Sequence, residues 1–180
     1  MGVDPPKVEK RILPSLTAEQ VHRLIQRTDS LRDKAIIALF AESDPRLSEL
    51  ACICPDDIDW RNRLIKVRCK GGKEALAVFG ERTDGLLRSW LAQYQPNGGN
   101  VWGIDKWAII DMLQQLKKKT GLPCNPHAFR RTFACLLRKA GVDTMTIKDL
   151  GRWESLETVQ RYTRSVSFQD SMRFYKAPLS

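Results

Sequence analysis

Long apolar runs, histidines and paired cysteines are scarce in this 180-residue chain. No apolar stretch approaches the roughly 18 residues that a bilayer-spanning helix needs. The first residues, Met1-Gly2-Val3-Asp4, lack the apolar core of a secretory signal peptide. These absences argue against a membrane-spanning or secreted protein, so we expect an intracellular, cytoplasmic one.

Metal ligands are equally scarce. Only His22 and His127 are histidines, and the cysteines are odd in number without any Cys-x-x-Cys spacing: Cys52, Cys54, Cys69, Cys124 and Cys135. Structural zinc sites favour wider ligand spacing than Cys52-x-Cys54 offers. The sequence therefore predicts reduced, mostly buried thiols and no metal or other cofactor.

Acidic residues are outnumbered by basic ones, 21 against 30, which gives a net charge of +9 and a pI near 9.5. This excess favours a polyanionic partner, with nucleic acid first and an anionic membrane surface second. Charge alone does not distinguish either partner from a merely basic soluble protein. A hydrophobic content of 42% in a chain of this length is sufficient for one domain with a core of its own.

Apolar spacing changes from a helical period to a period of two and back again. Thr17 and Ser30 have the character of helix N-caps, and Ser43-Asp44-Pro45 should end the second helix. The fold class expected is α+β, mainly α-helical with a small three-stranded antiparallel sheet. We expect strands over 57–60, 64–69 and 74–79, and helices after 17, after 30, from 46, and over 84–94, 105–119, 126–140, 144–150, 155–162 and 168–175.

Several polar residues stand at the ends of these elements. Taken singly, each has an ordinary structural explanation. Arg46 can pair with Glu49 on a helix surface, His127 can be a half-buried histidine, and Tyr162 can be an aromatic residue at the edge of the core. The motifs in chain order are Arg46-Leu47-Ser48-Glu49-Leu50, Lys70 beside Gly71-Gly72, His127-Ala128-Phe129-Arg130, Leu150-Gly151-Arg152-Trp153, and Tyr162 nine residues after Trp153.

Together these motifs resemble the catalytic domain of the tyrosine recombinases, the phage-integrase family, over about residues 10 to 175. The resemblance implies the fold of DNA breaking-rejoining enzymes. It also implies that Arg46 and Arg130 bind the scissile phosphate, that Tyr162 is the nucleophile, and that His127 does general acid/base work. Lys70 would protonate the leaving 5′ oxygen, and Trp153 would offer its indole N–H to the phosphate.

This sequence departs from the family pattern at three places. Asp44-Pro45 stands where Gly-Leu usually precedes the first arginine, so we expect a differently shaped turn before Arg46. Trp153 replaces the more frequent histidine, and Arg131 follows Arg130 where histidine is common, which adds a cation. The catalytic lysine of the hairpin is either Lys70 or Lys73, and the spacing from Arg46 favours Lys70.

The resemblance also implies an organisation and a set of partners. Residues 1–14 are expected to be a lead-in and 15–180 the catalytic domain, with 166–180 forming a C-terminal helix or tail that docks on a neighbouring protomer. The partners would be double-stranded DNA and, on that DNA, further copies of the chain in a dimer or tetramer, whereas the free protein would be a monomer. Association with the nucleoid, and none with a membrane, is expected. Because the N-terminal DNA-clamping domain of full-length relatives is not present, weaker and less specific DNA binding is expected.

Two other functions remain open at this point. A type IB topoisomerase shares the chemistry but relaxes DNA as a monomer. A DNA-binding accessory protein with a disabled site would share the fold without the chemistry.

Overall fold

The computed structural model describes residues 2–4 and 11–179. Residues 1 and 5–10 of the expected lead-in, and Ser180 of the expected tail, lie outside this description. The helices are α1 Ala18–Gln26, α2 Leu31–Ser43, α3 Leu47–Ala51, α4 Glu81–Leu91, α5 Lys106–Thr120, α6 Pro126–Lys139, α7 Thr144–Leu150, α8 Leu156–Tyr162 and α9 Phe168–Met172. The strands are β1 Ile58–Asp59, β2 Leu64–Arg68 and β3 Glu74–Val78, and a short 3-10 turn, η1, spans Pro55–Asp57.

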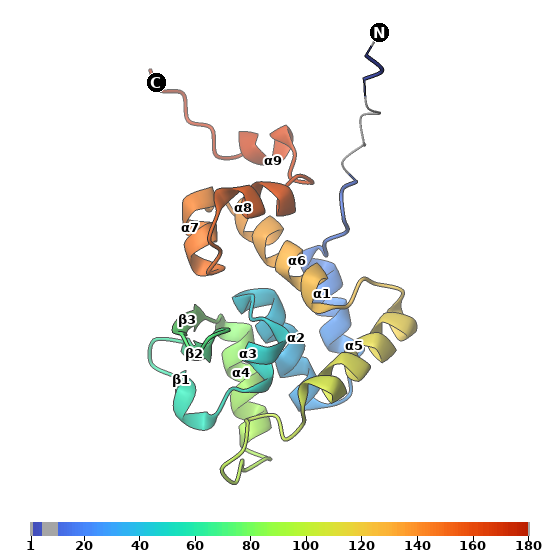
Figure 1. The fold of residues 1–180 in the computed structure, drawn as a ribbon, viewed down its shortest axis with the longest axis vertical. Helices are drawn as coiled ribbons and strands as arrows, with labels where there is room; N and C mark the ends of the chain where they lie inside the picture. The colour runs from blue at the N-terminus through green and yellow to red at the C-terminus, as the bar shows by residue number, and fades with distance from the viewer. Residues whose placement is uncertain (1, 5–10, 180) are drawn as a thin grey trace.

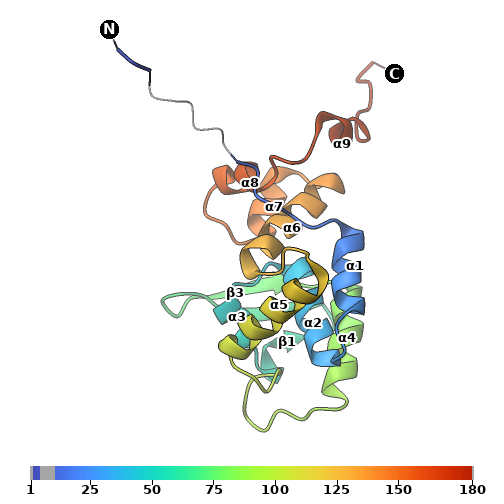
Figure 2. The same cartoon turned by 90° about the vertical axis from the view of Figure 1, so that its right-hand side faces the viewer.

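Helix α2 lies at the centre of the main core, between α1, α4 and α6 (Figures 1 and 2). Seven consecutive residues, 35 to 41, are buried, so the helix is covered on all sides and not only along the predicted stripe. Ser30 caps its first turn, and Phe40 stacks on Phe129 of α6 with ring centroids 5.3 Å apart. This stacking fixes the part of α6 that carries Arg130.

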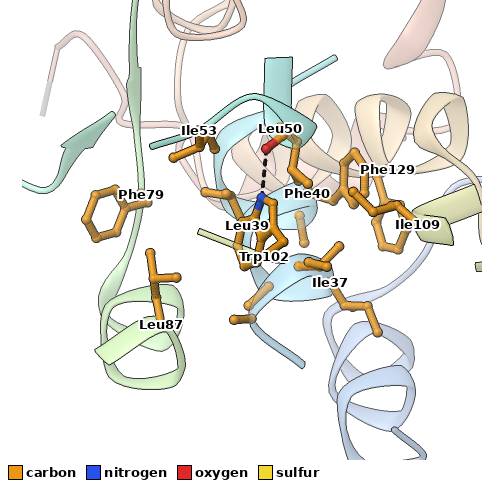
Figure 3. Close-up of a cluster of buried hydrophobic side chains, with 14 of the residues drawn as sticks. Ile37, Leu39, Phe40, Leu50, Ile53, Phe79, Leu87, Trp102, Ile109 and Phe129 are labelled. Atoms are coloured by element: carbon orange, nitrogen blue, oxygen red, sulfur yellow. Dashed lines mark hydrogen bonds between the residues drawn. The ribbon is translucent and has the colours of Figure 1, made fainter. Parts of the chain in front are cut away.

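Trp102 fills the middle of the same core without any exposed surface. Its indole N–H donates to the backbone oxygen of Leu50, at the end of α3, over 2.7 Å (Figure 3). The bond is shorter than the one that this helix-end carbonyl also accepts from the Ile53 backbone N–H, over 3.3 Å. Trp102 therefore ties the loop before α5 to the short helix that follows Arg46.

Replacing Trp102 with Phe should lower the free energy of unfolding by about 2 to 4 kcal/mol, because it removes buried volume and the buried hydrogen bond from the indole N–H to the Leu50 oxygen. Urea unfolding followed by circular dichroism measures the change. Trp107→Phe is the matched control, since Trp107 is 63% exposed. Equal stability of the two variants would contradict the assigned role of Trp102.

The sheet is antiparallel throughout, in the order β1-β2-β3, as the alternating pattern predicts. Ile65 and Val67 of β2 face the core. The turn between β2 and β3 contains Gly71 and Gly72 with φ of 85° and 79°, a backbone region that favours glycine. The hairpin thereby holds the two exposed lysines, Lys70 and Lys73, at its tip.

A smaller hydrophobic cluster lies apart from the main core and joins α6, α7 and α8. Phe133 of α6 packs there with Ile147, Trp153 and Val159, whereas Phe129 of the same helix belongs to the main core. Helix α6 thus runs from one cluster to the other, as its course in Figure 1 shows. The helix ends at Lys139, one residue before the predicted end, and Ala140 is its exposed C-cap.

Helix α4 begins at Glu81, three residues before the predicted start. Its N-cap, Gly80, has no side chain to accept the free N–H groups of the first turn. Glu42 of α2 supplies the acceptor, with Oε2 3.0 Å from the Gly80 nitrogen and 3.1 Å from the Thr83 nitrogen. A capping carboxylate 38 residues away along the chain leaves no local sequence signal.

The five cysteines are free thiols. Cys124 and Cys135 are buried, and burial raises the pKa of the Cys124 thiol to about 12. The expectation of mostly buried thiols was wrong for the other three, since Cys52 is exposed and Cys54 and Cys69 are half-buried, at the ends of short elements. Within the described residues, no helix combines the length and apolar character that a membrane span requires.

Candidate active site

One open cavity of about 830 Å³ gathers most of the residues singled out from the sequence. It lies between the α2–α3 turn, the β2–β3 hairpin, α6 and the α7–α8 segment. Six of its lining side chains are arginine or lysine and two are glutamate, so the cavity is strongly cationic. The lining includes five of the six predicted site residues: Arg46, Lys70, Arg130, Trp153 and Tyr162.

Arg46 is the N-cap of α3, and its side chain is 51% exposed into the cavity. Its backbone N–H donates to Oε2 of buried Glu49 over 2.8 Å, and its Nη1 lies 3.9 Å from Glu49 Oε1. The pairing with Glu49 suggested by the i,i+3 spacing is therefore present. The longer side-chain distance leaves the guanidinium free to bind an anion in the cavity.

The turn before Arg46 depends on Asp44, the residue that departs from the family pattern. Asp44 ends α2 in the left-handed conformation, with φ 51° and ψ 46°, which aspartate tolerates better than most residues. Its carboxylate is fully buried, and Oδ1 lies 3.1 Å from Nε of Arg130, whose side chain is 14% exposed. The two atoms do not meet hydrogen-bond geometry, so the contact is an ion pair that orients Arg130.

Desolvation raises the pKa of Asp44 to about 7, against the opposing pull of Arg130 and Arg152 and with a smaller upward contribution from Glu49. The folded protein therefore binds this proton more tightly than the unfolded chain. The stabilisation is complete below about pH 4, the unfolded pKa, and is lost as the pH rises to about 7.

Asp44→Asn should remove this pH dependence. Relative to wild type, the variant should gain stability between pH 4 and 7, by up to roughly 4 kcal/mol for a shift of about three pKa units. Urea unfolding at several pH values measures the difference, and exposed Asp56→Asn is the control. A difference that stays constant between pH 4 and 7 would contradict the assigned burial of the charge.

Trp153 and Tyr162 form one wall of the cavity. Their rings make an edge-to-face contact with centroids 5.4 Å apart, and Trp153 in turn packs edge-on against Phe133. Tyr162 is the last residue of α8, and its backbone oxygen accepts from the Cys135 thiol at 3.0 Å. Among the described residues, the indole nitrogen of Trp153 is buried without a hydrogen-bond partner, so this donor is unsatisfied in the free protein.

The hairpin places both candidate lysines at the opposite side of the cavity. Lys70 and Lys73 both line it and both are exposed. The Cys69 N–H donates to the Lys73 oxygen over 2.7 Å, which closes the turn between them. The choice between the two lysines therefore remains the one made from the sequence spacing.

His127 does not line this cavity. It is an exposed residue in the first turn of α6 and lines a neighbouring cavity of about 590 Å³. Arg46 and Arg130 border both cavities. An anion held between these two arginines would therefore be approached by Tyr162 from one side and by His127 from the other.

Arg152 is a further lining residue that the sequence reasoning did not single out. Its side chain is only 13% exposed and bonds to buried Glu49 over 3.1 Å. Its φ of 57° lies in the left-handed region, which arginine seldom adopts, so the residue type does not predict this conformation. The signal available in the sequence was its position directly before Trp153.

Comparisons with known proteins identify the family and the fold of this chain. The model of the phage integrase family matches residues 14–167. Tyrosine recombinase XerA of Saccharolobus solfataricus is 30% identical over 162 residues, which cover 89% of this chain and 55% of that protein. The chain thus spans little more than half of this relative's length.

Two solved structures share the fold. The crystal structure of a XerA recombinase superposes with a TM-score of 0.80 at 24% identity, over 95% of this chain and 65% of the other. A XerH site-specific recombinase bound to a palindromic difH substrate gives 0.73 at 18% identity, over 94% and 53%. With its family match extending over most of the described sequence and its fold shared with these recombinases, the chain belongs to the phage integrase family.

Proposed function

We propose that this chain is the catalytic part of a site-specific DNA recombinase, which cuts and rejoins DNA strands through a covalent 3′-phosphotyrosyl intermediate. The observation that carries the proposal is the meeting of Arg46, Arg130, Trp153 and Tyr162 at one cationic cavity from three separate parts of the chain. Single residues of these types are common on protein surfaces. Their convergence is what phosphodiester chemistry requires.

The two arginines would bind the scissile phosphate. A phosphodiester repels nucleophiles through its negative charge, and the pentavalent transition state carries still more charge on the nonbridging oxygens. Guanidinium groups donate paired N–H groups to such oxygens in a fixed geometry. Arg130, oriented by Asp44, and Arg46, anchored through its backbone by Glu49, are preorganised for this task.

The hydroxyl oxygen of Tyr162 would then attack the phosphorus atom. The new P–O bond forms as the bond to the 5′ oxygen breaks, which leaves a 3′-phosphotyrosyl enzyme and a free 5′-hydroxyl. The ordinary pKa of tyrosine, about 10, makes the phenol a weak nucleophile unless its proton is removed during attack. The covalent link preserves the bond energy, so a 5′-hydroxyl of another strand can reseal the DNA without ATP.

Proton transfer falls to the residues around the phosphate. His127 is the candidate general acid/base. It would act from the neighbouring cavity, on the side of the bound phosphate opposite Tyr162. Lys70, at the hairpin tip, would protonate the departing 5′ oxygen, and Lys73 is the alternative. The indole N–H of Trp153 would donate to a nonbridging oxygen, which gives its orphaned nitrogen a partner.

A nicked suicide duplex tests this proposal. Cleavage near the nick releases a short strand, so religation fails and the protein remains attached to the DNA. We expect an adduct on a denaturing gel, formed also in the presence of a chelator because the arginines supply the positive charge at the phosphate. Failure to form an adduct across a library of duplex sequences would contradict the proposal.

Self-association on DNA is part of the proposal. Helix α9 exposes Phe168 and Met172, at 76% and 56%, on the outside of the molecule (Figure 2). An apolar groove of about 350 Å³, lined by residues that include Val78, Phe133 and Leu136, could receive such a helix from a second copy. The groove and the helix are complementary in character, both being apolar.

Light scattering on the complex with a two-site duplex tests this assembly. Wild type should add two or more copies per duplex cooperatively, whereas Phe168→Asp combined with Met172→Asp should add copies independently, because a charge would be buried in the groove. Equal cooperativity would contradict docking through α9. Strand exchange between two duplexes, measured against relaxation of a supercoiled plasmid, distinguishes a recombinase from a topoisomerase.

A further inference from the structure

The residues of the candidate site are built on two different packing units. Leu47 and Leu50 lie in α3, the helix that follows Arg46, and both pack in the main core. Trp153 and Tyr162 belong to the smaller cluster on α6. In Figure 1, α7 and α8 stand on α6, apart from α3 and the sheet. Tyr162, the proposed nucleophile, and Arg46 therefore need a connection that fixes their relative positions.

Arg152 makes this connection. Its Nη2 donates to the backbone oxygen of Asp44 over 2.9 Å and to Oε2 of Glu49 over 3.1 Å. Its Nη1 lies 3.4 Å from the backbone oxygen of Ser43. These carbonyls lie at the C-terminal end of α2, where backbone oxygens lack helical partners and a cation is favourable.

The two clusters are also linked through α6, whose Arg130 pairs with Asp44 and lies over the Trp153 ring, but the direct hydrogen bonds are concentrated in Arg152. In the part of the chain that the structure describes, every hydrogen bond from residues 143–162 to residues 43–49 comes from Arg152. The same Glu49 carboxylate that receives Arg152 also accepts the backbone N–H of Arg46. Arg152 therefore binds the Glu49 carboxylate, which also positions the backbone of Arg46.

The backbone at both ends of the contact is strained. Arg152 has φ 57° and Asp44 has φ 51°, a region that favours glycine over residues with a Cβ. Strained residues of this kind persist where their surroundings over-determine them, and they are concentrated at functional sites. At position 152 the guanidinium contact with the α2–α3 turn adds to a backbone hydrogen bond from the Arg152 N–H to the Asp149 oxygen, over 3.1 Å.

We propose that Arg152 is a positioning residue whose guanidinium fastens the α7–α8 segment to the α2–α3 turn and so aligns Tyr162 with a phosphate held by Arg46 and Arg130. Its effect on cleavage rests on the proposed function. The fastening itself is a property of the free protein and can be measured without DNA.

Arg152→Gly is the informative variant, because glycine accepts the left-handed backbone and only the side chain is lost. Arg63→Gly is the matched control. Arg63 is also an arginine with positive φ, 53°, but it pairs with Glu81 at 3.4 Å and does not line the cavity. An effect that both variants share comes from the relief of backbone strain or from the loss of a positive charge, and not from the contact with the α2–α3 turn.

Amide hydrogen exchange of the free protein is the first measurement. Arg152→Gly should raise exchange in residues 144–162 by about tenfold or more and leave α2 and α5 unchanged, whereas Arg63→Gly should behave as wild type in this segment. Unchanged exchange would overturn the proposal, whatever happens to cleavage. Faster exchange in a protein whose wild type forms no DNA adduct would support the fastening while refuting the proposed function.

Single-turnover cleavage of the suicide duplex is the second measurement. Misplacement of Tyr162 by about 1 Å should slow cleavage by about 10- to 100-fold. DNA affinity should change by less than about threefold, because the Arg152 guanidinium is already occupied by protein acceptors. Added guanidinium ion at low millimolar concentration should restore part of the rate. A cleavage defect with unchanged exchange would mean that Arg152 acts on the DNA directly, which would overturn the positioning role.

Discussion

Tyr162→Phe should abolish the covalent protein–DNA adduct while leaving the fold intact. The variant removes one oxygen atom, and in the described structure the Tyr162 hydroxyl makes no hydrogen bond that its loss would break. The ring contact with Trp153 is kept. Loss of a nucleophile lowers cleavage by more than about 10⁴-fold, below what a gel detects. Stability should change by less than about 0.5 kcal/mol.

The control is the same change at another tyrosine. Tyr94 stacks on Trp90 in α4, with centroids 5.0 Å apart, outside the cavity. Tyr94→Phe should form the adduct at the wild-type rate. An adduct that survives Tyr162→Phe, in a variant with normal DNA affinity, would exclude Tyr162 as the nucleophile. DNA binding without adduct formation by the wild type would favour the accessory-protein alternative.

Arg130→Lys should slow single-turnover cleavage by about 10³-fold although the positive charge is kept. An ammonium group cannot donate the paired, planar N–H groups that two phosphate oxygens accept. The lysine can still neutralise the buried Asp44 carboxylate, so the variant should remain folded. Binding should weaken only several-fold, because many other phosphates contribute to affinity.

Arg131→Lys is the matched control for this substitution. Arg131 follows directly in the chain, but its Nε donates to the Pro14 backbone oxygen and its side chain does not line the cavity. It should cleave within about threefold of wild type, as expected for a surface charge away from the chemistry. Equal rates for the two variants would contradict the assignment of Arg130 to the phosphate. Thermal unfolding of both shows that any rate loss is not a folding defect.

The sequence predicted the elements whose signals are local. Thr17 and Ser30 cap the first two helices, as their residue types indicated, and the glycine turn between β2 and β3 lies where the alternation of the strands required it. The fold class and the three-stranded sheet are confirmed. Long-range caps were not predictable, because Glu42 begins α4 from another helix.

In the candidate site, too, the features with local sequence signals were predictable and those that depend on long-range contacts were not. Arg46, Arg130 and Tyr162, which the motifs singled out, line one cavity, and their catalytic roles stay predictions. The departure at Asp44-Pro45 predicted a differently shaped turn, but not that Asp44 adopts the left-handed conformation and places its carboxylate beside Arg130. Arg152 was not predicted, because its strained backbone and its hydrogen-bond partners, which are distant in the sequence, can be seen only in the folded structure.

Locating the covalent bond tests the central claim most directly. The adduct formed on a suicide duplex is digested with protease and nuclease, and mass spectrometry identifies the residue that carries the remaining nucleotide. We expect a nucleotide joined through its 3′ phosphate to the oxygen of Tyr162. A nucleotide on any other residue, or a link through a 5′ phosphate, would contradict it.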